Sequence, residues 1–362
     1  MQVKVLSRPV SPPQGGKAVH ADRIASLVGA VPLEDPLEVR VEPEARHGDV
    51  VLARVIEVNP AYPMLETNGQ EEVDLEPGQT ILGVLGSRKA LQGFSGDPPA
   101  RMKPGMELFL LNRGGVIGEC SAFHRDLGWP TRLEYVGTLH RENGPVNLKD
   151  YSLPMVTDSV IEVPVILVVG TCMNAGKTTV CKQLVQAFSE KGFTVHAGKV
   201  AGVGCLRDPL AMKEAGAREV LGFHDFGIPS TAHLETVAPV ARSIVHHLSQ
   251  SKPDFILLEM GDGVLGGYHV YSLFEDKEFM NSCVGMIVCA NDYMGVWGVM
   301  KWMSQQKIKD FPILVSGPVT DSAEGVRYIE EQWKLPAGNA FDSTGKICSF
   351  VLQSLMPWLE LE

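Results

Sequence analysis

One stretch of 18 residues, VPVILVVGTCMNAGKTTV from Val163 to Val180, limits what this chain can fold into. It begins with an apolar run and continues through a glycine-containing loop into a segment with helical spacing. A strand that is apolar along its whole length, rather than at alternate positions, is typical of a parallel sheet buried on both faces. The stretch therefore predicts a strand–loop–helix unit in an α/β domain.

The loop in this stretch resembles a phosphate-binding loop (P-loop), in which backbone N–H groups at a helix N-terminus cradle a phosphate. It ends in Gly176–Thr179, where Lys177 would bind the β- and γ-phosphates and Thr178 would bind Mg²⁺. The strict pattern has a glycine six residues before the lysine, but this chain has Thr171 there and the glycine one residue earlier, at Gly170. The alternative is a glycine-rich turn with an incidental surface lysine.

Composition limits the class of protein. A chain of 362 residues predicts two domains, and no apolar run approaches the roughly 18 residues that span a membrane. The N-terminal residues lack the apolar core of a signal peptide, so we expect a cytoplasmic protein. The net charge of −11 argues against a nucleic-acid partner. Seven cysteines without a CxxC pair suggest neither a disulfide framework nor a zinc ribbon.

Residues 1–150 are predicted to form a small β-rich, barrel-like domain, because short runs of β-branched residues alternate with Gly and Pro. We expect an irregular arm over residues 1–20, a short helix over His20–Val31, and strands at Asp49–Val58, Gln79–Leu85 and a hairpin over Met106–Cys120. This domain would recognise a substrate or a partner. Its polar residues among turns either line a cleft or are simply solvated: His47, Arg88, His124, Arg125, Arg132 and His140.

Residues 160–362 alternate between buried strands and amphipathic helices, which predicts a mostly parallel sheet with helices on both faces. The expected strands after the first are Phe193–Ala197, Asp254–Glu259, Val284–Ala290 and Phe311–Ser316. The expected helices are Lys177–Lys191, a run from Asp208 to Leu221, Thr236–Leu248, Val296–Lys307, Ser322–Trp333 and Ile347–Leu359. Ligands of such sheets bind at the carboxyl ends of the strands, which places Lys199, Glu259 and Asn291 near the P-loop.

Two carboxylates are candidate metal ligands with Thr178. Glu259 ends an apolar strand downstream of the P-loop, as in a Walker B element, although it could merely terminate the strand. Asp208 precedes a proline and could be a metal ligand, a helix N-cap, or both. Lys199 lies in a glycine-rich strand end and is either functional or solvated.

Several segments, taken in order over about residues 163–340, resemble the dethiobiotin synthetase branch of P-loop proteins. They are the displaced-glycine P-loop, Gly198–Gly204, Arg207–Met212, Phe226–His233 and Leu258–Gly263. The resemblance implies that ATP and Mg²⁺ are used, with Lys177 and Lys199 acting in catalysis and Thr178, Asp208 and Glu259 holding the metal. It implies a nucleotide contact at Gly170, Thr171, Asn174, Ala175, Gly176, Lys177, Thr178, Thr179, Ser316, Gly317 and Pro318, of which the last three would lie near the base.

The chain departs from that branch where a substrate would bind. The branch has an aspartate where this chain has Cys172, and its glycine turn after the glutamate is interrupted here by Met260 and Asp262. We therefore take Cys172, Asp262, His269 and Asn291 as candidate substrate contacts. The N-terminal domain has no counterpart in the simple synthetase.

Three functions remain open on the sequence. The first is a ligase or synthetase that activates a carboxylate or carbamate of a small acidic metabolite by phosphoryl transfer from ATP or another nucleoside triphosphate. The second is an NTPase switch in cofactor or metal-centre assembly, and the third is an acyl-group transferase on a reused P-loop fold. We expect no membrane or nucleic-acid partner, and a homodimer is possible.

Overall fold

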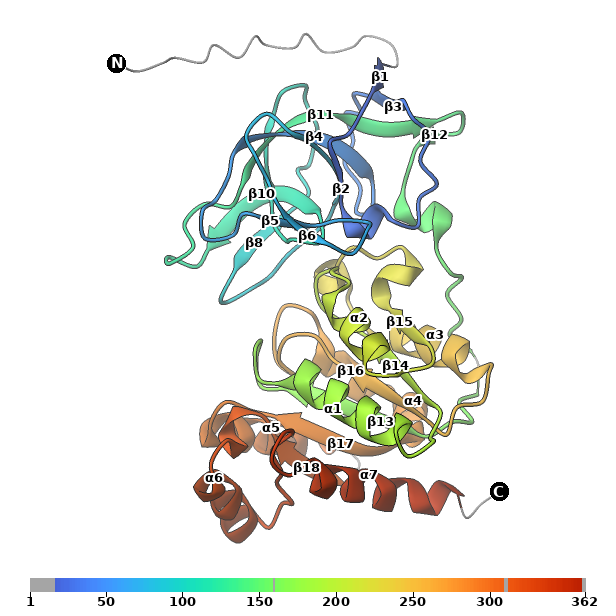
Figure 1. Ribbon diagram of the computed structural model, residues 1–362, viewed down its shortest axis with the longest axis vertical. Coiled ribbons are helices and arrows are strands. Elements are labelled where there is room, and N and C mark those ends of the chain that lie inside the picture. Colours follow the sequence, from blue (N-terminus) through green and yellow to red (C-terminus); the bar gives the residue numbers. More distant parts are fainter. Residues whose placement is uncertain (1–16, 159, 309–311, 360–362) are drawn as a thin grey trace. The chain divides into compact units, whose positions relative to one another are not determined.

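The computed structural model describes residues 17–158, 160–308 and 312–359 (Figure 1). The chain divides into two compact units. One comprises Met1–Gly86 and Gly93–Tyr151, and the other comprises Ser87–Gln92 together with Ser152–Glu362. No helix in the described part of the chain has the length and apolarity needed to cross a membrane.

The first unit is β-rich and includes a closed ring of five strands. The ring consists of β4 (Val50–Glu57), β7 (Thr80–Leu85), β10 (Val116–Phe123), β9 (Glu107–Leu110) and β11 (Arg132–Arg141), each paired with the next and β11 with β4. Within this ring only the β7–β10 pairing is parallel. The other strands are β1 (Lys17–Val19), β2 (Arg23–Ile24), β3 (Leu37–Arg40), β5 (Met64–Glu66), β6 (Glu72–Asp74), β8 (Phe94–Asp97) and β12 (Gly144–Pro145).

The helix predicted over His20–Val31 is wrong. Arg23 and Ile24 form β2, which pairs with β7, and only the short 3₁₀ helix η1 (Ser26–Val28) follows. Hydrogen bonds to β7, which lies far away in the sequence, stabilise a strand here although the local spacing of apolar residues is helical. Of the predicted arm, residues 1–16 lie outside the described residues, while Lys17–Val19 form strand β1 against β3.

The second unit contains a six-stranded parallel sheet in the order β15-β14-β16-β13-β17-β18. Its strands are β13 (Val165–Gly170), β14 (Val195–Lys199), β15 (Val220–Gly222), β16 (Phe255–Glu259), β17 (Cys283–Cys289) and β18 (Ile313–Ser316). Every residue of β13, β14 and β16 is buried, which confirms the interpretation of the apolar runs.

Helices cover both faces of this sheet (Figure 1). Alternate residues of β13 point to opposite faces: Leu167 packs in a core with α3 and α5, whereas Ile166 packs in a core with α1, α2 and α7. The helices are α1 (Lys177–Ser189), α2 (Arg207–Glu214), α3 (Ala238–Ser249), α4 (Lys277–Ser282), α5 (Tyr293–Gln306), α6 (Ala323–Tyr328) and α7 (Thr344–Leu359). The predicted fold class is therefore confirmed.

Two predicted helices differ in extent. The run from Asp208 ends with α2 at Glu214, because Gly216 follows with a φ of 109° and Val220–Gly222 joins the sheet as β15. The helix predicted over Ser322–Trp333 is α6 followed by a π-helical turn, Ile329–Trp333. Phe311, the predicted start of the last strand, lies outside the described residues.

Candidate functional site

The P-loop connects the end of β13 to the start of α1. Gly170 ends the strand, and Lys177 begins the helix with its side chain folded back, so that Nζ donates to the carbonyl of Cys172 at 2.8 Å. A Cβ atom on Gly170 would lie 2.6 Å from Nζ of Lys177, which is closer than the atoms can approach. The glycine displaced by one residue is therefore the one that makes room for the lysine.

Lys177 is buried, with 6% of its surface exposed. Burial lowers its pKa and the charge of Lys199 lowers it further, while Glu259 and Asp262 act in the opposite direction. An anionic ligand beside this amine would favour its charged form in the same way as these carboxylates do. The electrostatics of the loop are thus suited to a phosphate group.

Three side chains from separate elements converge beside the P-loop. Lys199, at the end of β14, donates to Glu259 at 2.5 Å and to Asp208 at 2.7 Å. The hydroxyl of Thr178 lies 2.9 Å from Glu259 Oε1 and 3.2 Å from Asp208 Oδ1. Lys199 and Glu259 are direct partners in the parallel register of β14 and β16, which brings the two strand ends together.

The pKa shifts in this cluster follow from burial and pairing. Burial alone would lower the pKa of Lys199, but the charges of Asp208 and Glu259 outweigh it and raise the pKa. Burial would raise the pKa of Asp208, but Lys199 outweighs it and lowers the pKa. Burial does raise the pKa of Glu259, because its side chain is only 1% exposed.

The cluster fits the Mg²⁺ that a P-loop implies. Two carboxylates and a threonine hydroxyl are hard oxygen donors, which Mg²⁺ prefers, and the site leaves other positions to water and phosphate oxygens. The Oε2 atom of Glu259 is buried and has no hydrogen-bond partner among the described residues, so an acceptor is available there. Within the described ranges no group of three or more His, Cys, Asp and Glu residues forms a metal site of protein ligands alone.

Asp208 is not the N-cap of α2. It is the second residue of the helix, after Arg207, and Leu206 holds the N-cap position. Its carboxylate accepts hydrogen bonds from Lys199 and Thr178 instead. The capping alternative is therefore wrong, since the side chain is directed at the cluster.

The four candidate substrate residues have different surroundings. Asn291 donates through Nδ2 to the sulfur of Cys172 at 3.1 Å, so Asn291 lies against the P-loop. Asp262 has a φ of 55°. Burial raises the pKa of Asp262, and the charge of Lys177 opposes that shift. The ring of His269 contacts the hydroxyl of Tyr271 at 3.2 Å.

The remaining nucleotide-binding candidates surround the same loop. Thr171 donates its backbone N–H to Cys289 at the end of β17, and Asn174 has a φ of 58°. Ala175 is fully buried, and Thr179 is the third residue of α1. The segment Ser316–Pro318 lies against the loop, because a Cβ on Gly176 would be 3.3 Å from Cα of Gly317.

Sequence reasoning missed one set of neighbours. Asn174 donates to Gln92 at 3.4 Å, and the backbone N–H of Lys89 donates to the hydroxyl of Tyr268 at 3.1 Å. Nothing in the local pattern around Gln92 indicates contact with a loop 82 residues away. Arg88 lies in the same segment, and the sequence shows it only as a polar residue among turns.

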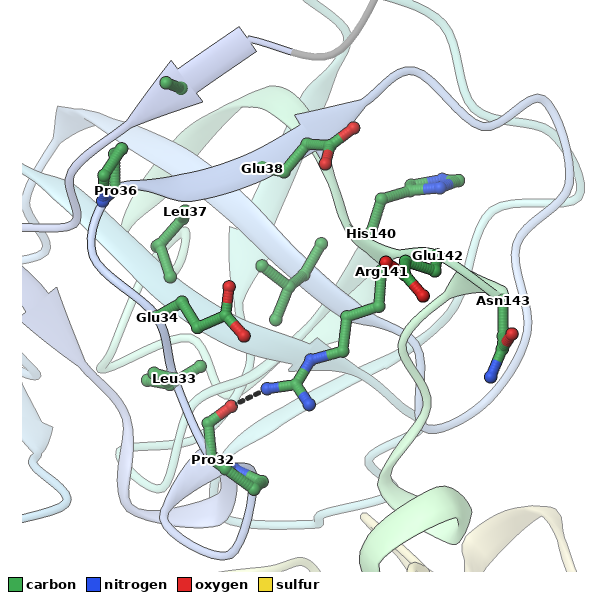
Figure 2. Close-up of a pocket in the computed structure, with 12 residues that line it drawn as sticks. Pro32, Leu33, Glu34, Pro36, Leu37, Glu38, His140, Arg141, Glu142 and Asn143 are labelled. Carbon is green, nitrogen blue, oxygen red and sulfur yellow. Dashed lines mark hydrogen bonds between the residues drawn. The ribbon is translucent and has the colours of Figure 1, made fainter.

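The first unit has a cavity of about 680 Å³ near the end of β11 (Figure 2). Arg141 reaches across it and donates to the carbonyl of Pro32, while Glu34 and Glu142 line the walls. His140 lies 2.7 Å from Glu42. His140, one of the residues expected either to line a cleft or to be solvated, is buried and lines this cavity, whereas none of the catalytic, nucleotide-binding, metal-binding or substrate candidates does.

No protein-family model and no curated protein matches the chain. Among solved structures, the signal recognition particle receptor FtsY from Elizabethkingia anophelis, in complex with GDP, is 17% identical with a TM-score of 0.35, over 50% of this chain and 58% of that one. FtsY from Thermotoga maritima is 17% identical with a TM-score of 0.36, over 52% and 68%. A DUF1611 family protein from Anabaena variabilis is 11% identical with a TM-score of 0.40, over 58% and 63%.

This chain therefore spans less than two thirds of the first FtsY structure. All three TM-scores lie below 0.5, so the assignment of a P-loop fold rests on the strand order and the geometry of the site. A parallel sheet, a loop with a buried lysine at a helix N-terminus and a carboxylate at the end of the adjacent strand together form a P-loop nucleotide-binding fold.

Proposed function

We propose that the protein binds a nucleoside triphosphate with Mg²⁺ and transfers its γ-phosphoryl group to a carboxylate or carbamate of a small metabolite. The observation that carries this proposal is the cluster of Lys199, Thr178, Asp208 and Glu259 beside the P-loop lysine. ATP is the expected nucleotide, and GTP is the other candidate.

In the proposed reaction, an oxygen of the acidic group forms a bond to the γ-phosphorus while the bond to the β,γ-bridging oxygen breaks. The electron pair of that bond leaves with the nucleoside diphosphate, and the product is an acyl phosphate. Lys177 and Lys199 would hold the transferring group and offset its charge, so that catalysis comes from positioning and electrostatics. Bound Mg²⁺ would neutralise phosphate charge, held by Thr178, Asp208 and Glu259.

The resemblance to the dethiobiotin synthetase branch supports an acidic group as acceptor, followed by capture by a nitrogen nucleophile or by ring closure. The departures at Cys172 and Asp262 lie at the P-loop itself, where the acceptor would bind. We therefore propose phosphoryl transfer to an acidic group, as in that branch, and do not extend the proposal to that branch's own substrate.

A ligand-binding screen tests the proposal. Thermal unfolding would be followed with Mg-ATP, Mg-GTP and a panel of small carboxylates, because a ligand of the folded state stabilises it by about 2.7 kcal/mol at 100 times its dissociation constant. Nucleotide consumption that requires a carboxylate supports the synthetase. Slow consumption that a partner protein accelerates would favour the switch, and absence of nucleotide binding would favour the acyl transferase.

Lys177→Ala gives the sharpest single test. We expect this variant to lose nucleotide turnover and the stabilisation by Mg-ATP, because the buried amine at the start of α1 is the group that we propose binds the phosphates. Lys182→Ala is the matched control, since Lys182 is an exposed lysine on the same helix. Full turnover in Lys177→Ala would refute the assignment.

A further inference from the structure

Lys199 is the counter-ion of both carboxylates that we propose as metal ligands. Its ammonium donates to Glu259 Oε1 at 2.5 Å and to Asp208 Oδ2 at 2.7 Å. The Thr178 hydroxyl lies 2.9 Å from the same Glu259 Oε1 and 3.2 Å from Asp208 Oδ1. Of the four carboxylate oxygens, only Glu259 Oε2 has no hydrogen-bond partner in the described part of the chain. The proposed metal ligands are therefore already engaged with one ammonium and with one another.

Burial makes this positive charge hard to replace with water. The side chain of Glu259 is 1% exposed and that of Lys199 is 10% exposed. A buried charge that loses its partner is strongly destabilising, because little solvent reaches it. Glu259 therefore needs a cation beside it, and the ammonium of Lys199 supplies this charge to Glu259 and Asp208 together.

The backbone of Lys199 is fixed on both sides by the sheet. Lys199 pairs with Glu259 of β16 in the parallel register, and the backbone N–H of Val200 donates to the carbonyl of Glu259 at 3.0 Å. On its other side Lys199 pairs with Gly222 of β15. A change of ionic partner must therefore come from rotation within the flexible four-carbon stem of the lysine.

We propose that Lys199 excludes a free divalent cation from Asp208 and Glu259, so that Mg²⁺ is bound only together with a nucleotide. The inference rests on the proposed function, in which Lys199 contacts the transferring phosphoryl group. The ammonium and a divalent cation would share the same carboxylate oxygens, and two cations that close repel each other. Phosphate oxygens offer Lys199 another anionic partner, which allows it to release the carboxylates to the metal.

This exchange would couple the two roles of Lys199. Without a nucleotide, Lys199 neutralises Asp208 and Glu259 and keeps the site closed to free metal ions. With a nucleotide and a metal, the same ammonium is available to the phosphoryl group. The lysine would therefore reach its place in catalysis only when both ligands are present.

A Mn²⁺ titration of the nucleotide-free protein tests the inference, with unbound Mn²⁺ measured by electron paramagnetic resonance. Mn²⁺ is the probe because, like Mg²⁺, it prefers oxygen ligands. Wild-type protein should bind Mn²⁺ weakly. Lys199→Met and Lys199→Gln should bind it about tenfold more tightly or better, because both carboxylates are then left to the metal. A second titration adds a non-hydrolysable ATP analogue, whose own Mn²⁺ affinity is measured separately, and wild-type protein should then bind Mn²⁺ tightly.

Three further variants show whether the charge of Lys199 is responsible. Lys199→Arg keeps the positive charge and should exclude Mn²⁺ as wild-type protein does. The double variant Lys199→Met/Glu259→Gln should lose the tighter Mn²⁺ binding, because one of the two ligand charges is gone. Lys182→Met is the matched control, since it removes an exposed lysine of α1 and should leave the Mn²⁺ affinity at the wild-type value.

Equal Mn²⁺ affinities of wild-type protein, Lys199→Met and Lys199→Gln would overturn the inference. It would also be overturned if the ATP analogue binds to wild-type protein without increasing its Mn²⁺ affinity. If both neutral variants are unfolded, Mg²⁺ alone should restore their folding, as followed by tryptophan fluorescence, and failure to do so would count against the inference in the same way.

The outcomes distinguish the two proposals. If the neutral variants gain no Mn²⁺ affinity but wild-type protein binds Mg-ATP or Mg-GTP, the inference is refuted and the proposed phosphoryl transfer stands. If wild-type protein binds neither nucleotide, the proposed function itself fails, whatever the Mn²⁺ affinities of the variants.

Discussion

Replacing Lys199 with methionine would remove one ammonium and keep the length and apolar stem of the side chain. In the native protein this ammonium lies 2.5 Å from Glu259 and 2.7 Å from Asp208, with 10% of the lysine side chain exposed. Removing one partner of a buried ion pair costs about 3–5 kcal/mol, because the other charge stays buried. Glu259 is 1% exposed and Asp208 is 32% exposed, so water relieves only the second. We expect a loss of about 3 kcal/mol near pH 7.5.

The loss should depend on pH with a definite sign. Burial already raises the pKa of Glu259 above its usual 4.5, and without Lys199 this pKa rises further. A group whose folded-state pKa is raised contributes stability that is present below its unfolded pKa and is lost as the pH rises through the folded pKa. The deficit of Lys199→Met should therefore shrink as the pH falls towards about 5. The raised pKa of Lys199 means that the native protein loses this lysine's contribution only above pH 10.5.

Urea unfolding followed by tryptophan fluorescence measures this effect. Four of the five tryptophans lie beyond residue 290, so a Trp129→Phe background confines the signal to the unit that contains Lys199. Lys182→Met serves as the control, because it removes an exposed lysine. The double variant Lys199→Met/Glu259→Gln should recover much of the lost stability, because it also removes the buried charge of Glu259. A deficit under about 1 kcal/mol, or one that is equal at about pH 5 and pH 7.5, would refute the reasoning.

Two further substitutions test other parts of the structure. Gly170→Ala should weaken Mg-ATP binding at least tenfold in titration calorimetry, because the added Cβ would meet Lys177 Nζ. Gly345→Ala is the control, since its Cβ would meet open space, and equal Mg-ATP affinities of the two variants would contradict the packing argument. Arg242→Ala should lower the free energy of unfolding by about 2 kcal/mol, because Arg242 makes a bidentate ion pair with Asp276 at 2.5 and 2.6 Å. An unchanged midpoint of urea unfolding would contradict this prediction.

The P-loop and the cluster beside it could be predicted because their determinants are local or follow from strand geometry. The apolar run, Gly170 and Lys177 are contiguous in the sequence. Lys199 and Glu259 each end a buried strand, and parallel strands place their carboxyl ends at one edge of the sheet. The hydrophobic periodicity and the positions of glycine in the sequence therefore predict most of the arrangement of these residues.

The parts that could not be predicted depend on contacts between distant residues. The segment over His20–Val31 has a helical spacing, but β2 is formed through hydrogen bonds to β7 more than 50 residues away. The backbone N–H of Lys89 donates to the hydroxyl of Tyr268, 179 residues away, and no periodicity in SRKALQ indicates that partner. Side-chain direction at such positions is set by tertiary packing, which a single sequence does not display.

The balance of charge at the P-loop gives a physical reason for the proposed metal. Two lysines, Lys177 and Lys199, face three carboxylates, those of Asp208, Glu259 and Asp262, so with all five groups ionised the cluster carries a charge of −1. A triphosphate would be repelled by such a cluster, whereas one divalent cation would change its charge to +1. The same arrangement thus links two requirements of the proposed reaction: a metal for the nucleotide and Lys199 for the transferred phosphoryl group.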